Sequence, residues 1–282
     1  MKLLVVGANG KTGRHVIEAL RKRAEPITIR GFSRRPVINS AIDEAMQGDL
    51  DNPNDRARAV EGMNVIVHYG PALDPRETSM GTGMIDAAIA AGVSRFIYIS
   101  VIHPGISDLM NHQAKQAVEA YLLNTNLDWT ILRPQHYMQN IDISAAVRDG
   151  RLAFPWPVKT RLGHVDMCDL AKVVAKVVTE TGHSYACYDI AADEHLTVEE
   201  ICATISRLSK RTVSPRAEPP DQVIDRISRQ LSLPIYTVEA MYRLFGYYAR
   251  RGIRGNGNVL GWLLGRPPTS FESYVARRLA EG

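Results

Sequence analysis

The segment Gly7-Ala8-Asn9-Gly10-Lys11-Thr12-Gly13 constrains the fold of this chain more than any other feature. It follows a short apolar run, residues 3–6, and precedes an amphipathic segment, residues 14–22. A glycine-rich turn between a strand and a helix brings backbone N–H groups and the positive end of the helix dipole to one place, where they attract phosphate. The sequence therefore predicts a dinucleotide pyrophosphate site, with cofactor contacts from Gly7, Asn9, Gly10, Lys11, Thr12 and Gly13.

Strands and helices are expected to alternate after this turn. The apolar patterns predict strands near residues 26–32, 45–48, 64–69, 94–100 and 128–132, with helices near 76–91 and 109–124 and another that begins at Asn52-Pro53. Such alternation is typical of right-handed crossovers and a parallel sheet covered on both faces. The predicted fold class is therefore α/β, with a doubly wound, mainly parallel sheet.

The alternation loosens after residue 150, where prolines and short segments become frequent. We predict a nucleotide-binding domain over residues 1–150. Residues 151–282 are expected to form a smaller, mostly helical part that closes a substrate site and partly returns to the sheet.

The end of the second expected strand indicates which dinucleotide is bound. NAD-selective sites place an acidic residue there for the ribose hydroxyls, whereas this chain has Ser33-Arg34-Arg35. A guanidinium group suits a 2′-phosphate, so NADP(H) is the predicted cofactor. Further cofactor contacts are expected at the ends of later strands, from Asp49, Leu50, Gly70, Pro71, Ser100 and Pro134.

Composition excludes several other classes of protein. The 34 Lys and Arg against 30 Asp and Glu are scattered, so no nucleic-acid partner is expected. No stretch approaches the apolar length of a membrane span, and the three cysteines form no CxxC pair. The eight histidines lack metal-ligand spacing. We therefore expect a cytoplasmic protein with no membrane association and no metal site.

Several blocks resemble the NmrA-like branch of the atypical short-chain dehydrogenase/reductase proteins. Besides the glycine turn, they are residues 91–100, 112–119, 127–140 and 264–272. The resemblance spans nearly the whole chain and implies an NAD(P)-binding Rossmann fold. The wider superfamily uses a Tyr-x-x-x-Lys pair, in which Lys lowers the pKa of Tyr and holds the nicotinamide ribose. Lys115 matches the Lys, but Asn111 stands where the Tyr would be.

The missing Tyr leaves three hypotheses open. The first is an NADPH-dependent reductase of a small aromatic, quinone or enone-like substrate, with Lys115 and either His112 or His103 as catalytic residues. An imidazole pKa near ~6.5 suits proton transfer at neutral pH. The substrate pocket is then expected to include His103, His136, Tyr137, Asn140 and Trp156.

The second hypothesis is a non-catalytic NADP(H)-binding redox sensor that acts through a protein partner, as some members of the family do. The third is a non-redox isomerase or cyclase on the same scaffold. The apolar helix expected over residues 76–91 packs against the sheet alone or also against a second copy, so the sequence leaves a homodimer open.

Overall fold

The computed structural model describes residues 1–281 of the chain, which divide into two compact units. Unit 1 consists of Met1–Ile106, Asn111–Arg133 and Met167–Tyr188, and unit 2 consists of Ser107–Met110, Pro134–Asp166 and the chain from Asp189 onward.

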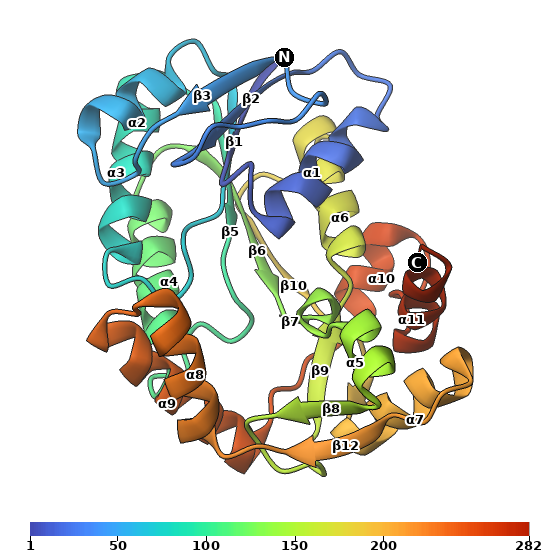
Figure 1. Ribbon diagram of the computed structural model, residues 1–282. Coiled ribbons are helices and arrows are strands. Elements are labelled where there is room, and N and C mark those ends of the chain that lie inside the picture. Colours follow the sequence, from blue (N-terminus) through green and yellow to red (C-terminus); the bar gives the residue numbers. More distant parts are fainter. Residues whose placement is uncertain (282) are drawn as a thin grey trace. The chain divides into compact units, whose positions relative to one another are not determined.

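Unit 1 is built around a seven-stranded sheet (Figure 1). Every neighbouring pair from β6 to β3 is parallel. The order reverses direction between β1 and β4, which is the point where a doubly wound sheet opens a crevice for a ligand. In spatial order the strands are β10 (Ala186–Ile190), β6 (Asp128–Pro134), β5 (Arg95–Ile99), β4 (Val65–His68), β1 (Lys2–Val6), β2 (Thr28–Ser33) and β3 (Glu44–Gln47).

Helices cover both faces of this sheet, which confirms the predicted fold class. On one face α1 packs against α6, and on the other α2 packs against α3, next to α4 (Figure 1). Both faces of the central strands are therefore buried, and β1, β4 and β5 read as apolar runs rather than as alternating patterns. The helices are α1 (Lys11–Arg21), α2 (Pro53–Val60), α3 (Glu77–Ala90), α4 (Met110–Leu123) and α6 (Met167–Thr179).

The core of unit 1 depends on close approach between helices. The face under α2, α3 and α4 is filled by aromatic side chains from the sheet, among them Phe96, Tyr98 and Trp129. Gly81 of α3 lies against Val118 of α4, so closely that a Cβ added there would stand 2.6 Å from a Val118 methyl group. A small residue at this position therefore sets the spacing of α3 and α4.

Unit 2 contains two small sheets and several helices. One sheet has the order β11-β9-β7, and the other pairs β12 with β8 in parallel. A reciprocal capping box between Thr197 and Glu200 begins α7. The strands are β7 (His136–Tyr137), β8 (Arg151–Phe154), β9 (Leu162–Val165), β11 (His195–Leu196) and β12 (Ser214–Ala217), and the helical segments are η1 (Met138–Asn140), α5 (Ile143–Asp149), α7 (Val198–Ser209), α8 (Pro220–Leu231), α9 (Ile235–Arg251), α10 (Asn258–Leu264) and α11 (Phe271–Ala280).

The two units interleave along the chain, whereas the expected division at residue 150 is contiguous. Residues 134–150 belong to unit 2. In the other direction, α6 and the first part of β10 return to the large sheet, because the amphipathic α6 buries its apolar stripe against α1.

The tight packing of the first glycine turn gives a stability prediction. A Cβ at Gly13 would stand 2.4 Å from the Gly7 carbonyl oxygen and 2.9 Å from the Ala8 Cα, which are backbone atoms that cannot turn away. We expect Gly13→Ala to lower the free energy of unfolding by about 2 kcal/mol or more, measured by urea denaturation. The control is Gly105→Ala, where the nearest atom is the Gln116 amide nitrogen at 3.9 Å and the change should stay within about 0.5 kcal/mol. Equal stability of the two variants would contradict this account.

Candidate functional site

Backbone contacts shape the glycine turn between β1 and α1. Gly7 has φ +75°, a conformation that favours glycine, and its carbonyl accepts a hydrogen bond from the Gly10 N–H at 2.8 Å. Gly10 is the N-cap of α1 and supplies no side chain to cap it, and no acidic residue lies in the first helical turn. The N–H groups that begin α1 are thus left without an acidic competitor, as a phosphate site requires.

A hollow of about 250 Å³ opens beside this turn. It lies at the ends of β1, β2 and β4, where the strand order reverses. Of the residues predicted to contact the cofactor, the structure brings eight to this hollow. Its lining is Val6, Gly7, Gly10, Phe32, Ser33, Arg34, Asp49, Leu50, Tyr69, Gly70, Pro71, Asp74 and Met80.

The other predicted cofactor residues take different positions. Asn9 lies in the turn and its amide donates to the carbonyls of Arg35 and Pro36 at 3.1 and 3.0 Å. Thr12 and Gly13 are buried in α1, and Lys11 is exposed at its first position. Ser100 and Pro134 are buried at the ends of β5 and β6. None of these six residues lines the hollow, whose lining comes from unit 1 alone.

The loop that carries the two predicted phosphate-binding arginines is anchored on both sides. Asn9 holds the carbonyl of Arg35, and the Gln47 amide donates to the carbonyl of Arg34 at 3.1 Å. Both arginine side chains are exposed, and no described carboxylate forms an ion pair with either. Arg34 lines the hollow and Arg35 follows it in the same loop, and neither guanidinium is held in a described ion pair, which suits a ligand with a phosphate at this end.

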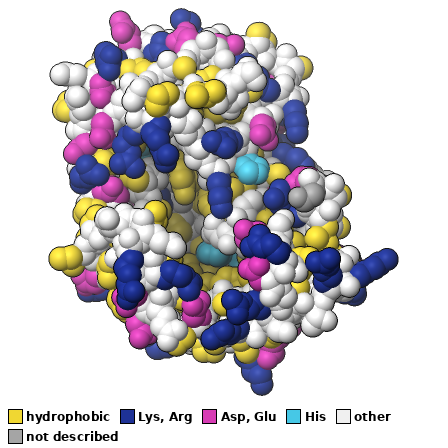
Figure 2. Space-filling model, in the orientation of Figure 1, with side chains coloured by type: hydrophobic (Ala, Val, Ile, Leu, Met, Phe, Trp, Pro, Cys, Tyr) yellow, Lys and Arg dark blue, Asp and Glu magenta, His cyan; other side chains and the backbone are white. Residues whose placement is uncertain are grey.

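Positive charge is not concentrated elsewhere on the visible surface. In Figure 2 the Lys and Arg side chains are interspersed with Asp and Glu.

Among residues 1–281, no group of His, Cys, Asp or Glu side chains is arranged to hold a metal ion. No helix in the described part of the chain has the length and apolar character to cross a bilayer.

Lys115 lies on α4 in a buried polar cluster. Its Nζ is 2.6 Å from Oε1 of Glu77, the first residue of α3, and the two side chains are only 5% and 1% exposed. The same Nζ lies 5.4 Å from the centre of the Tyr69 ring and 5.8 Å from that of Tyr98. Burial opposes the charged form of Lys115, but the neighbouring Tyr98, Glu77 and Tyr69 outweigh it, so that the pKa of Lys115 is raised.

His103 and His112, the two proposed proton donors, differ in their surroundings. His103 is exposed in the loop after β5 and adopts φ +51°. Its carbonyl lies 3.0 Å from Nδ1 of His112, and since a carbonyl only accepts, this nitrogen donates. The Nε2 of neutral His112 then carries no proton. Burial lowers the pKa of His112 to about 4, so this ring is an unfavourable proton donor at neutral pH.

The residues predicted for the substrate pocket fall mostly in unit 2. His136 and Tyr137 form β7, and Asn140 ends the short η1 segment. The Nε2 of His136 lies 3.3 Å from the Asn140 amide nitrogen. The remaining predicted residue of this group, Trp156, is 6% exposed.

Aromatic rings surround these residues. Trp156 stacks on Phe154 with centroids 4.7 Å apart and meets Tyr248 edge-on at 5.5 Å. The His136 ring is 5.0 Å from that of His164, a residue that the sequence did not single out. Burial lowers the pKa of His136 to about 4 and that of His164 well below its ordinary value, so both rings are neutral at pH 7. His103, by contrast, belongs to unit 1.

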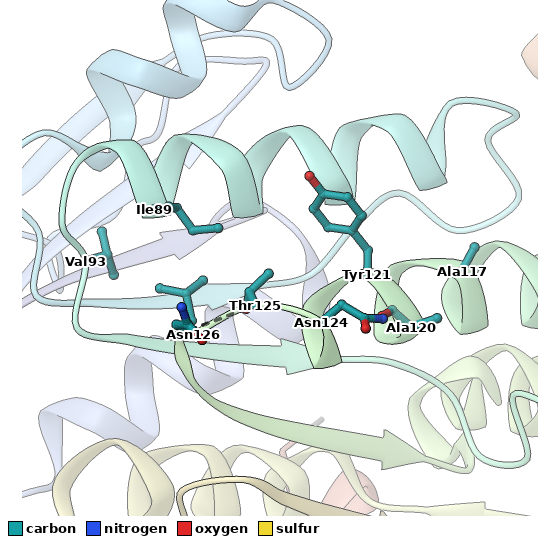
Figure 3. A pocket seen from close by; sticks show the side chains of 9 residues that line it. Ile89, Val93, Ala117, Ala120, Tyr121, Asn124, Thr125 and Asn126 are labelled. Carbon is teal, nitrogen blue, oxygen red and sulfur yellow. Dashed lines mark hydrogen bonds between the residues drawn. The ribbon is translucent and has the colours of Figure 1, made fainter.

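A second hollow in unit 1 is larger, about 700 Å³, but carries no comparable chemistry. It lies between the C-terminal ends of α3 and α4, with the side chains drawn in Figure 3. The Tyr121 hydroxyl, its most polar group, donates to Asp86 at 2.5 Å. Its lining is Ile89, Val93, Ala117, Ala120, Tyr121, Asn124, Thr125, Asn126 and Leu127.

The fold and the glycine turn together define a doubly wound dinucleotide-binding protein. Comparison with protein families agrees with this class: a family model described as NAD(P)H-binding matches residues 7–181. The chain therefore belongs to this NAD(P)H-binding family.

Two curated relatives match over nearly their full lengths. The chain is 23% identical to the NAD(P)H azoreductase of Xenophilus azovorans, over 99% of this chain and 98% of the relative. It is 25% identical to quinone oxidoreductase 2 of Escherichia coli (strain K12), over 97% of each.

Solved structures confirm the Rossmann fold and the resemblance to NmrA. The crystal structure of the Escherichia coli quinone oxidoreductase QOR2 with NADPH has a TM-score of 0.81 at 22% identity, covering 98% of this chain and 99% of that one. NmrA, described as a negative transcriptional regulator and crystallised with NAD, has a TM-score of 0.75 at 16% identity, covering 98% and 94%.

Cofactor selectivity provides a test of the arginine assignment. We expect Arg34→Ser and Arg35→Ser each to lower the ratio of NADPH to NADH affinity by about tenfold, because each removes a charged donor for the 2′-phosphate. Calorimetric titration with each cofactor measures this ratio. Lys22→Ser, at the exposed far end of α1, removes the same charge and should leave the ratio unchanged. An unchanged ratio in both arginine variants would show that the 2′-phosphate is not bound here.

The buried histidines make stability depend on pH. Burial, followed by the charge of Lys115, lowers the pKa of His68 to about 3, so acid favours the unfolded chain, in which this group keeps its ordinary pKa near 6.5. The contribution of His68 to the free energy of unfolding is complete above pH ~6.5, and it is lost as the pH falls towards the pKa of His68 in the folded protein. His68→Phe keeps a ring between Phe96 and Tyr98. Between pH 8 and pH 5, the free energy of unfolding of this variant should fall by about 2 kcal/mol less than that of the wild type. Urea denaturation at both pH values measures the difference. His15→Gln should behave as wild type, and equal pH slopes in all three proteins would contradict the assignment.

Proposed function

We propose that this chain is an NADPH-dependent reductase of a small aromatic acceptor of the quinone or enone type. The observation that carries the proposal is a combination found in unit 1. A hollow beside the glycine turn has Arg34 in its lining, and Lys115 is charged but has no Tyr acid four residues before it. The two full-length relatives are named azoreductase and quinone oxidoreductase, which both imply conjugated acceptors.

The residues present fit the predicted cofactor. The glycine turn and the N-terminus of α1 would hold the pyrophosphate, since Gly10 has only the Gly7 carbonyl near its Cβ position, at 3.1 Å. Arg34 and Arg35 would bind the 2′-phosphate, and Asp49 and Leu50 would border the adenine. We assign the nicotinamide ribose to Lys115, as the family resemblance implies. When bound, the reduced cofactor supplies a hydride.

The absence of a Tyr acid favours an acceptor that needs little proton assistance. A quinone that gains a hydride becomes a hydroquinone monoanion, whose charge is delocalised over the ring, and it needs one proton to complete the reduction. A simple ketone would instead develop a localised alkoxide that requires a strong donor. Asn111 has no acidic proton, and His112 is neutral with its one N–H donated to a carbonyl. Solvent or the exposed His103 is therefore the proton source we propose.

We propose His136, Tyr137, Asn140 and Trp156 for recognition of the acceptor. Trp156 belongs to an aromatic group with Phe154 and Tyr248, and neutral His136, with Tyr137 and Asn140 beside it, carries hydrogen-bonding groups. A planar acceptor with carbonyl oxygens uses both kinds of contact, because aromatic stacking favours the ring and neutral donors favour the oxygens.

Oxidation of NADPH by a panel of acceptors tests this proposal. We expect a benzoquinone or naphthoquinone to oxidise NADPH, followed by the loss of reduced-nicotinamide absorbance, and Lys115→Ala to lower kcat/KM by about 100-fold. Lys172→Ala, which removes an exposed lysine on α6, should keep wild-type activity.

Two outcomes would overturn the reductase proposal. NADPH that binds tightly but is not oxidised by any quinone, enone or azo acceptor would favour the redox sensor. Conversion of a substrate without consumption of NADPH would favour an isomerase or cyclase.

A further inference from the structure

The buried ion pair between Lys115 and Glu77 has a larger role than the proposed function gives it. Only Lys115 corresponds to a residue of the family motif, yet Glu77 is the more deeply buried of the two, at 1% exposure. A buried carboxylate loses much hydration energy, and it persists where a partner compensates for that loss. At 2.6 Å from Glu77 Oε1, the Lys115 ammonium is that partner.

The surroundings direct the ammonium group as well as neutralise it. A lysine has three N–H donors, and Glu77 is the one acidic residue in an ion pair with Lys115 among residues 1–281. The rings of Tyr69 and Tyr98 lie 5.4 and 5.8 Å from the Nζ and restrict it on two further sides. Donors therefore remain for a ligand after the ion pair has formed.

The pair lies directly behind the wall of the cofactor hollow. Tyr69 and Gly70 both line that hollow. A Cβ at Gly70 would stand 3.6 Å from Glu77 Oε1 and 3.8 Å from His68 Nε2. Because Gly70 has no side chain, the backbone alone separates the hollow from Glu77.

The other titratable groups around the pair do not replace Glu77. His68 on β4 is neutral, since burial and the charge of Lys115 lower its pKa to about 3, and burial raises the pKa of Tyr98, so its hydroxyl is neutral at pH 7. Burial raises the pKa of Glu77, as does the like charge of Asp74 to a smaller degree, while the charge of Lys115 and its hydrogen bond oppose that rise and favour the carboxylate. His112 repels Lys115 only if it is protonated. Glu119, one turn further along α4, is bound to Arg133 at 2.6 Å.

We propose that Glu77 is a positioning residue for the cofactor: it keeps the Lys115 ammonium charged and directed, and so preserves NADP(H) binding at alkaline pH. The inference rests on the proposed role of Lys115 at the nicotinamide ribose. Without Glu77, Lys115 would be a buried cation with no counter-ion, and such a lysine loses its proton at a much lower pH.

The affinity for NADP⁺ as a function of pH, measured by calorimetry, tests this directly and needs no turnover. We expect the wild-type dissociation constant to stay nearly constant from about pH 7 to pH 9.5, because Lys115 remains charged there. Glu77→Gln should bind about tenfold more weakly at pH 9.5 than at pH 7, relative to wild type. Glu119→Gln removes a buried carboxylate from the same helix region and should follow the wild-type profile.

The outcomes separate this inference from the proposed function. If Lys115→Ala binds NADP⁺ as tightly as wild type, the ribose assignment fails. If Lys115→Ala binds weakly but Glu77→Gln has the wild-type pH profile, the role of Glu77 alone is overturned. If Glu77→Gln does not fold, the inference is tested by the affinity of the wild-type protein for NADP⁺ as a function of pH. A loss of that affinity between pH 7.5 and pH 9 would overturn the inference. Restoration of the flat profile in Glu77→Asp would support a carboxylate requirement.

Discussion

The close approach of α1 to β1 at the glycine turn is the constraint on which unit 1 depends. The N–H groups of Gly7 and Ala8 both donate to the Phe32 carbonyl at the end of β2, at 2.9 and 3.1 Å. The turn therefore fixes the end of β2 as well as the start of α1. Asn9 extends this connection to the loop that holds Arg34 and Arg35. The proposed pyrophosphate site and the proposed 2′-phosphate site are thus parts of one hydrogen-bonded structure.

The charged side chains of unit 1 differ in whether they have a partner of opposite charge. The exposed arginines at the hollow have no acidic partner, while the buried Lys115 has one in Glu77. The difference follows from solvent: an exposed guanidinium is stabilised by water, whereas a buried ammonium needs a counter-ion. Burial likewise opposes the charged form of His68 and His112, and since no carboxylate pairs with either ring, their pKa values are lowered and they stay neutral at pH 7.

Much of unit 1 could be predicted because its signals are local. The glycine spacing, the apolar runs of β1 and β4, and the arginines after β2 can each be recognised within a few residues of sequence. Strand and helix limits shifted by one or two positions, as for the third strand, expected at 45–48 and found at Glu44–Gln47. Unit 2 was less predictable, because its strands are two to four residues long and pair with segments far away in the chain, as β7 does with β9. His164 and Tyr248 join the aromatic group only through that pairing and through α9.

The sequence by itself determined the class of fold and the glycine turn, and it predicted the selectivity element, since each depends on backbone conformation or on neighbouring residues. The tertiary structure decided which charges meet. Glu77 and Lys115 are 38 positions apart on different helices, and nothing in the residues around Glu77 distinguishes it from an ordinary acidic residue at the start of a helix. Only the packing of α3 beside α4, with Gly81 against Val118, brings the two charges together and removes water from them. Burial and contact between distant segments arise from folding, and so the electrostatics of this site could not be predicted from sequence alone.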